Sequence, residues 1–239
     1  RATYFVGCTR CYTCDDKISF PITITKDQKM VLTHHQIILW LQQCAQLFEQ
    51  NSDYLTDLDR EIGDADHGLN MNRGFKKVAE KLPEFADKDI GFILKNTGMT
   101  LLSNIGGASG PLFGTFFIRA AKPTASLQSL DVNQLYEMTK EGVDGIVSRG
   151  KAQPNDKTMC DVWWPVVDSL KHANDQSLSI EDAIDNALKV AEKAAEETIP
   201  MQAKKGRASY LGERSIGHKD PGSASVVLIL QALSNAIHA

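Results

Sequence analysis

Apolar residues recur at intervals of three and four along most of the chain, which is the spacing of one buried face of an α-helix. The first stripe spans residues 37–48, and shorter stripes follow at residues 55–62 and 71–82. Pro83 ends the third stripe, because proline lacks the backbone N–H that a continuing helix donates. The pattern therefore predicts three helices, the first of which begins directly after Met30.

The same spacing continues to the end of the chain and predicts six more helices. They span residues 90–102, 112–120, 131–148, 158–173, 179–198 and 220–238. The apolar run 226–230 has the composition of a strand, but its alanine- and serine-rich flanks and the length of the segment favour a buried helix. Strands and helices do not alternate along the chain, which argues against a doubly wound sheet. The predicted fold is an all-α bundle or barrel.

Composition narrows the class of protein. A chain of 239 residues favours one domain with a sizeable core. Its net charge of −4 argues against nucleic-acid binding, which needs a strongly basic surface. Five cysteines, an odd number, and the lack of a signal-peptide pattern indicate a reducing cytoplasm. Apolar runs stay below the roughly 20 residues of a membrane span, so we expect a soluble cytoplasmic protein.

Residues 1–29 differ in character from the rest of the chain. They contain Cys8, Cys11 and Cys14, separated by two residues each, followed by a short alternating run. This cysteine spacing invites a zinc or iron–sulfur interpretation, but a fourth ligand is absent nearby. We interpret residues 1–29 as an extension without a role in the chemistry, and residues 30–239 as the functional domain.

An acidic turn holds the strongest candidate chemistry. Asp59, Asp64 and Asp66 fall between two predicted helices, in a stretch that also contains His67 and Gly68. Three hard oxygen donors without a nearby cysteine favour Mg²⁺, Mn²⁺ or Ca²⁺ over zinc. The carboxylates would repel one another unless a cation or protons neutralised them. The free N–H groups of the helix that starts next favour phosphate, so the stretch predicts a metal–nucleotide site. An acidic, solvated loop is the alternative.

Three further segments offer weaker signals. The glycine-rich turn 106–110 lets backbone approach a ligand closely, although a turn for close helix packing explains it equally well. The long polar loops 148–159 and 204–222 mix cations with glycine, and such loops are often functional. Within the second loop, Arg207 is placed to stabilise charge on a transferring phosphoryl group and Tyr210 to cover a base. Plain solvation remains the alternative for any single cation.

Four motifs together carry a resemblance to a known family. They occur in order at residues 58–72, 106–115, 206–214 and 220–222. With them, residues 30–239 resemble the ADP-binding L subunits of phosphotransferase-system-dependent dihydroxyacetone kinases. The resemblance implies a barrel of about eight amphipathic, antiparallel helices with the nucleotide site at one end. It offers no counterpart for residues 1–29.

The resemblance also implies a set of site residues. Asp59, Asp64 and Asp66 would hold two Mg²⁺ ions that bridge the phosphates of ADP. Arg207 would meet the phosphates and act in catalysis. The residues expected to contact or enclose the nucleotide are His67, Gly68, Leu69, Asn70, Ala108, Ser109, Gly150, Met159, Arg207, Asp220, Pro221 and Gly222.

In this family ADP is a resident coenzyme. The resemblance implies that a phosphohistidine on an M subunit rephosphorylates ADP in place, and that the resulting ATP phosphorylates dihydroxyacetone held by a K subunit. ATP-dependent relatives carry a fused K domain, for which we expect no room in 239 residues. The alternative function is a nucleotide-binding regulatory partner without turnover, which docks to a transcriptional regulator.

Overall fold

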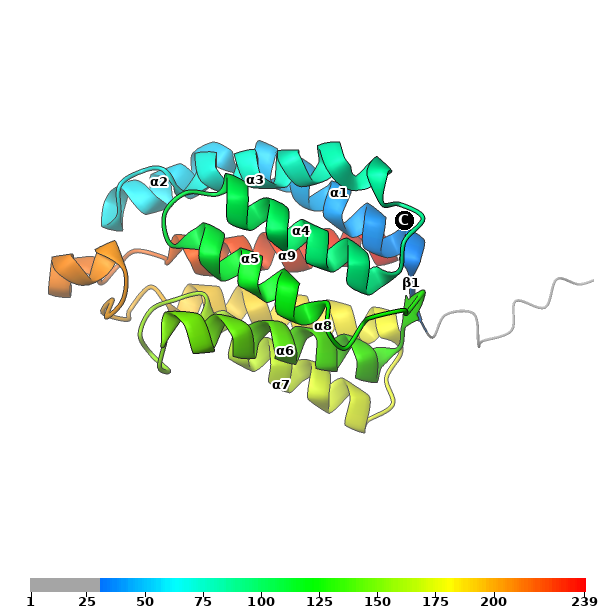
Figure 1. The fold of residues 1–239 in the computed structure, drawn as a ribbon. Helices are drawn as coiled ribbons and strands as arrows, with labels where there is room; N and C mark the ends of the chain where they lie inside the picture. Colours follow the sequence, from blue (N-terminus) through cyan, green and yellow to red (C-terminus); the bar gives the residue numbers. More distant parts are fainter. Residues whose placement is uncertain (1–30) are drawn as a thin grey trace, which may run out of the picture.

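The computed structural model describes residues 31–239, so the extension at residues 1–29, with its three cysteines, lies outside the described residues. Within the described range the chain forms nine α-helices and little else (Figure 1). They are α1 (His34–Gln50), α2 (Ser52–Ile62), α3 (His67–Lys81), α4 (Ile90–Asn104), α5 (Ser109–Ala120), α6 (Val132–Gly150), α7 (Cys160–Asp175), α8 (Ile180–Glu197) and α9 (Pro221–Ile237). Short 3-10 helices cover Leu82–Glu84 (η2) and Arg207–Ser215 (η3).

Eight of the helices close into a ring. Around it, α1 packs on α3, α3 on α4, and each later helix on the next as far as α9, which returns to α1. The remaining helix, α2, packs outside the ring against α3 and α9. The predicted all-α barrel is therefore confirmed, and the run 226–230 lies inside α9. Among the described residues, no helix is both long and apolar enough to cross a membrane.

Polar side chains fix where several helices start. Thr33, Asp89, Asp131, Ser179 and Asp220 each accept a hydrogen bond from the backbone N–H three residues later. Each such cap is worth about 1 kcal/mol, because it satisfies a donor that the helix itself leaves unpaired. The starts of α1, α4, α6, α8 and α9 are thus set by local sequence.

Close packing between α4 and α5 positions the glycine-rich turn that joins them. A Cβ atom added to Gly98 would lie 2.6 Å from the carbonyl oxygen of Gly114, so the two helices touch through their backbones. Deeper in the barrel, aromatic rings fill the core, with the Phe116 and Trp163 rings stacked at a centroid distance of 4.5 Å. The turn 105–108 is therefore held by two tightly packed helices.

At the end of the barrel where α1 begins, two short strands depart from the predicted all-helical pattern. Residues Leu32–Thr33 form a strand, β1, that pairs antiparallel with Ser129–Leu130, β2. The first helix thus begins at His34, and the prediction that it starts directly after Met30 was wrong. Two-residue strands are too short to leave a period in the sequence, so the pattern does not reveal them.

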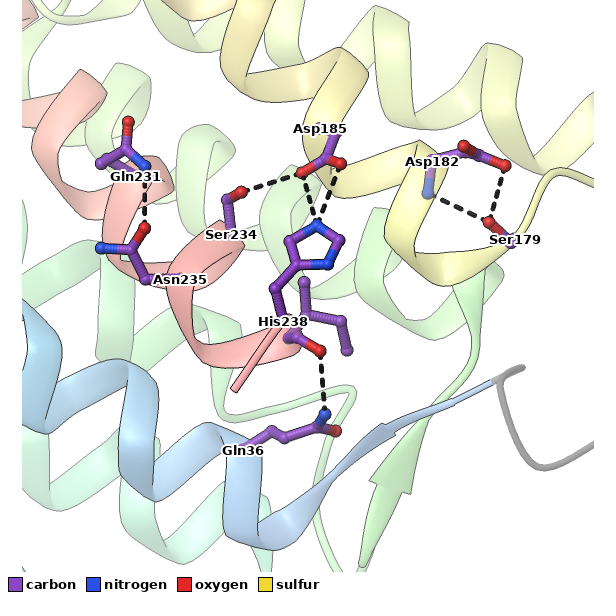
Figure 2. Close-up of polar contacts among 9 residues, drawn as sticks. Gln36, Ser179, Asp182, Asp185, Gln231, Ser234, Asn235 and His238 are labelled. Atoms are coloured by element: carbon purple, nitrogen blue, oxygen red, sulfur yellow. Dashed lines mark hydrogen bonds and ion pairs between the residues drawn. The ribbon is translucent and has the colours of Figure 1, made fainter. Parts of the chain in front are cut away.

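Figure 2 shows how the last helix is fastened at this end. Asp185 of α8 accepts a hydrogen bond from the Ser234 hydroxyl at 2.8 Å and pairs with His238 Nε2 at 3.0 Å. Gln36 Nε2 donates to the carbonyl oxygen of Ile237 at 3.5 Å. The serine and the histidine both bind the aspartate and not each other, so the group joins α8 and α9 and does not form a nucleophile–base pair.

Candidate nucleotide and metal site

A cavity of about 780 Å³ opens at the other end of the barrel, on the left in Figure 1. Helices α2 and α6 end at it, while α3, α5, α7 and α9 begin at it with His67, Ser109, Cys160 and Pro221 in its wall. Each helix start carries a partial positive charge. Four such starts around one cavity favour an anionic ligand, and the volume suits a molecule of nucleotide size.

The three predicted carboxylates meet at the edge of this cavity. Asp59 on the last turn of α2 is buried, whereas Asp64 and Asp66 on the following turn are exposed. One oxygen atom from each lies within 4.8 Å of the others. Ala65 between the exposed pair has a φ of +60°, so the chain reverses sharply there. All three donors are carboxylate oxygens, a set that fits Mg²⁺ completed by phosphate oxygens and water.

Asp59 has a second task that the sequence did not suggest. Its Oδ2 atom accepts hydrogen bonds from the backbone N–H groups of Asp66, at 3.0 Å, and His67, at 3.2 Å. The expectation that the start of α3 offers free N–H groups to phosphate is therefore wrong for these two groups, since Asp59 already occupies them. Gly63 allows this arrangement, because an added Cβ would collide with the Asp59 carboxyl group.

His67 joins three helix starts beneath the cavity. Its Nδ1 lies 3.1 Å from Ser109 Oγ of α5, and its Nε2 lies 2.7 Å from Ser225 Oγ of α9. Burial lowers the pKa of His67, and the negative charges of Asp59 and Asp66 oppose that shift. The ring is therefore held neutral with one nitrogen donating and one accepting. Ser225 is a partner that sequence reasoning missed, because it lies 158 residues away.

The start of α5 has more available N–H groups than the start of α3. Among the described residues, no side chain caps this helix, so the N–H groups around Ala108 and Ser109 are available to an anion. Gly107 has a φ of +63°, and a Cβ added there would meet open space. Both predicted residues, Ala108 and Ser109, line the cavity.

Three residues predicted to contact the nucleotide lie away from the cavity wall. Gly68 packs against the backbone of α2 at Ser52, and the Leu69 side chain is 59% exposed. Asn70 is buried and accepts a hydrogen bond from Arg73 Nη2 at 2.6 Å. Their contacts with a nucleotide stay a prediction.

Another part of the cavity wall combines apolar surface with the half-buried carboxyl group of Asp220. Gly150, Met159, Pro221 and Gly222 line it as predicted from the sequence, which suits the flat face of a base. Asp220 caps α9 by accepting from Ser223 N at 2.7 Å. Burial raises the pKa of Asp220 to about 6, although this hydrogen bonding lowers it again in part.

Arg207 reaches the carboxylates from the loop that follows α8. It begins η3, in a segment predicted to be irregular, and its Nη2 atom lies 3.0 Å from Asp64 Oδ2. The Arg207 side chain is 70% exposed, so its charge remains accessible to a ligand. Lys204, Lys205 and Tyr210 of the same loop also line the cavity. The three carboxylates and an exposed guanidinium thus lie together at one edge of the cavity.

Two further residues of the cavity wall were not singled out by the sequence. Lys157 belongs to the polar loop 148–159, where plain solvation was the alternative for any single cation, yet it is only 2% exposed. Cys160 is buried, and burial raises the pKa of its thiol to about 12, so it stays protonated and unreactive.

Comparisons with known proteins show the family to which this chain belongs. Residues 61–235 match the family model of the DAK2 domain. The chain is 65% identical over 207 residues to the PEP-dependent dihydroxyacetone kinase, ADP-binding subunit DhaL, of Escherichia coli, covering 87% of this chain and 99% of that subunit. It is 42% identical to the corresponding subunit of kinase 1 of Listeria innocua, covering 81% and 92%.

Solved structures show the same fold. The native dihydroxyacetone kinase of C. freundii superposes with a TM-score of 0.64 at 19% identity, covering 97% of this chain and 38% of that one. Its complex with AMP-PNP and Mg²⁺ gives a TM-score of 0.61 at 20% identity, covering 98% and 38%. This chain therefore spans well under half of the length of that kinase.

The chain belongs to the DAK2 domain family, and within it to the ADP-binding subunits of the phosphotransferase-type dihydroxyacetone kinases. The protein is therefore a kinase subunit.

Proposed function

We propose that this protein is the phosphoryl-transfer subunit of a phosphoenolpyruvate-dependent dihydroxyacetone kinase, acting in the cytoplasm. Bound ADP would carry the phosphoryl group. It would accept this group from a phosphohistidine of an M subunit, becoming ATP, and ATP would give it to a hydroxyl of dihydroxyacetone on a K subunit. The histidine returns to its free form and ADP stays in place. The observation that carries the proposal is the convergence of three carboxylates and four helix starts on one cavity.

The carboxylates would hold two Mg²⁺ ions. When bound, the ions neutralise phosphate charge and so lower the barrier to transfer. Asp59 is suited to anchor them, because its contacts with two backbone N–H groups fix the orientation of its carboxyl group. Asp64 and Asp66 on the exposed turn would complete the set.

The chain's other residues would orient the nucleotide. N–H groups at the start of α5 would bind phosphate oxygens, and His67 would hold the Ser109 hydroxyl toward them through its Nδ1 contact. The wall around Gly150 and Met159 would receive the base. Such fixed positioning is the main source of rate in phosphoryl transfer, where no side-chain nucleophile is needed.

Arg207 is the residue proposed for catalysis. Without a ligand it pairs with Asp64, which balances both charges. When the carboxylates bind cations instead, its guanidinium is free to turn toward the transferring group. An arginine at that position stabilises charge that spreads over the phosphoryl oxygens in the transition state.

Reconstitution tests the proposal. The purified chain is mixed with K and M subunits, the phosphotransferase proteins that phosphorylate M, phosphoenolpyruvate and dihydroxyacetone, and dihydroxyacetone phosphate is measured. We expect product that depends on this chain, that disappears with Asp64→Asn, and that persists with Asp168→Asn, an exposed carboxylate on α7. Absence of product with the wild-type chain would contradict the proposal, and ADP–Mg²⁺ binding without product would favour the regulatory alternative.

A further inference from the structure

Lys157 sits in an unusual place for a lysine. It lies in the turn between α6 and α7, is 2% exposed, and has a φ of +60°, which residues with a side chain seldom adopt. Among the described residues, no carboxylate lies within 4.0 Å of its ammonium group. Burial accordingly lowers the pKa of Lys157, and the negative charge of Asp220 opposes that shift. A buried ammonium without a carboxylate in contact is strongly disfavoured unless other groups replace its hydration.

Backbone carbonyl oxygens replace that hydration. Lys157 Nζ donates to the carbonyls of Thr198 at 2.9 Å, Met201 at 3.0 Å and Ser215 at 2.8 Å. The carbonyls of Ile199, at 3.4 Å, and His218 also face it. An ammonium group has three N–H donors, so five surrounding carbonyls exceed what it can bond linearly. The arrangement is that of a cation site made of main-chain oxygens.

Two helix ends contribute to this cage. Thr198 is the C-cap residue that directly follows α8, and Ser215 is the last residue of η3. Carbonyls at the end of a helix lack intrahelical partners and carry its partial negative charge. The carbonyls of Thr198 and Ile199 also accept from the backbone N–H groups of Met201, at 3.1 Å, and Gly217, at 2.8 Å, so the ammonium adds a second partner to these two acceptors.

The cage gathers both ends of one loop. Segment 198–218, here called the strap, leaves α8, carries Arg207 and Tyr210 along the cavity and returns to the cage (orange in Figure 1). Gly217 N donates to the Ile199 carbonyl at 2.8 Å, and Lys204 N donates to the Asp156 carbonyl at 3.0 Å. The two ends of the strap are thus hydrogen-bonded to each other and to the α6–α7 turn, beside the Lys157 ammonium group.

We propose that these carbonyls form a monovalent-cation site that Lys157 fills from within the chain, and that this contact positions the strap over the cavity. Lys157 is then a positioning residue for Arg207 and makes no contact with the transferring group itself. Loss of the ammonium leaves the carbonyl cage open to an external cation, because the side chain lines the cavity and small solutes can enter.

Chemical rescue tests the proposal. Lys157→Ala removes the side chain beyond Cβ, and added n-propylammonium has the size of the missing atoms. Added n-propanol is a neutral control of similar shape. Amide hydrogen exchange is measured over residues 199–218 in the ligand-free protein. We expect exchange at least tenfold faster in the variant, restored by n-propylammonium and not by n-propanol, with exchange in α4 and α5 unchanged. Lys189→Ala, an exposed lysine on α8, should show neither effect.

Unchanged exchange in the strap of Lys157→Ala, or equal rescue by the alcohol, would overturn the proposal. Lys157→Met keeps the apolar stem and loses only the charge, so its strap should exchange faster without rescue by the amine. If neither variant folds, nitrogen-15 spectra of the wild-type lysines decide. A slowly exchanging Lys157 ammonium signal at neutral pH supports the cage, and exchange as fast as that of surface lysines contradicts it.

The exchange measurement needs no nucleotide, so it is independent of the proposed function. A parallel titration with ADP and Mg²⁺ rests on that function and should show affinity reduced about tenfold in Lys157→Ala. If the wild-type chain does not bind ADP, the proposed function fails while the exchange result still decides the role of Lys157.

Discussion

Replacing Asp66 by asparagine should stabilise the ligand-free protein while removing most of its response to Mg²⁺. Asp66 is exposed and has two carboxylate neighbours, Asp59 and Asp64, with oxygens within 4.8 Å. In the absence of a metal ion, these like charges repel one another, and the Arg207–Asp64 pair offsets part of the repulsion that involves Asp64. Neutralising Asp66 relieves two of the three repulsions and also removes one ligand of the proposed metal site.

The size of the effect follows from the geometry. Two unit charges 4.8 Å apart repel by about 0.9 kcal/mol in the dielectric of water. Two such pairs give about 2 kcal/mol, and screening at 0.15 M salt, with a Debye length of about 8 Å, reduces this to about 1 kcal/mol. Losing a negative charge at the start of α3 opposes the gain by roughly 0.5 kcal/mol. No capping hydrogen bond is lost, because the Asp66 side chain makes none. The net gain of about 0.5 kcal/mol or more corresponds to a melting temperature roughly 2 °C higher.

Thermal denaturation followed by circular dichroism measures this change. Wild type, Asp66→Asn and the control Asp168→Asn are compared in EDTA and in MgCl₂, at low and at physiological salt. We expect the gain in EDTA to shrink as salt increases, and Mg²⁺ to raise the melting temperature of wild type and control but not of Asp66→Asn. A variant less stable than wild type in EDTA, or an equal Mg²⁺ response in all three proteins, would refute the reasoning.

Other changes test separate parts of the account. Arg207→Ala should slow single-turnover phosphoryl transfer by about 10³-fold while weakening ADP binding far less. Calorimetry on the same variant measures the ADP affinity, and equal losses of affinity and rate would make Arg207 a plain phosphate anchor. The pKa of Asp220 is about 6 in the folded protein, above its usual 3.8, so this group takes up a proton on folding. The free energy of unfolding therefore declines as pH rises from about 4 to about 6, by at most about 3 kcal/mol. Urea denaturation of Asp220→Asn should lack that decline, and parallel pH profiles would contradict the shift. Removal of residues 1–29 should leave product formation unchanged, because 207 aligned residues already cover 99% of the E. coli subunit; lost activity would give the extension a role.

The sequence predicted the ring of helices because each helix leaves a periodic apolar stripe and several begin at a capping side chain. It also predicted that Asp59, Asp64 and Asp66 come together, since they are separated by only a few residues around one turn. Local spacing carries both kinds of information. The boundaries of α6 to α9 accordingly fall within two residues of their predicted ends.

Features that depend on distant partners were not predictable. The five carbonyls around Lys157 come from residues 41 to 61 positions later, so nothing near Lys157 in the chain indicates burial. The contact between His67 and Ser225 spans 158 residues for the same reason. Asp59 was predicted to be a metal ligand, but its hydrogen bonds to the start of α3 depend on the exact path of the turn. Local patterns do not encode such geometry.

The central claim is that Asp59, Asp64 and Asp66 hold metal ions against a nucleoside diphosphate in the cavity. Crystals grown with ADP and Mn²⁺, measured at a wavelength where manganese scatters anomalously, test it most directly. The account predicts two anomalous peaks between these carboxylates and the phosphate oxygens, with the phosphates near the start of α5. Peaks elsewhere, or ADP bound in the cavity without any metal at the three carboxylates, would contradict it.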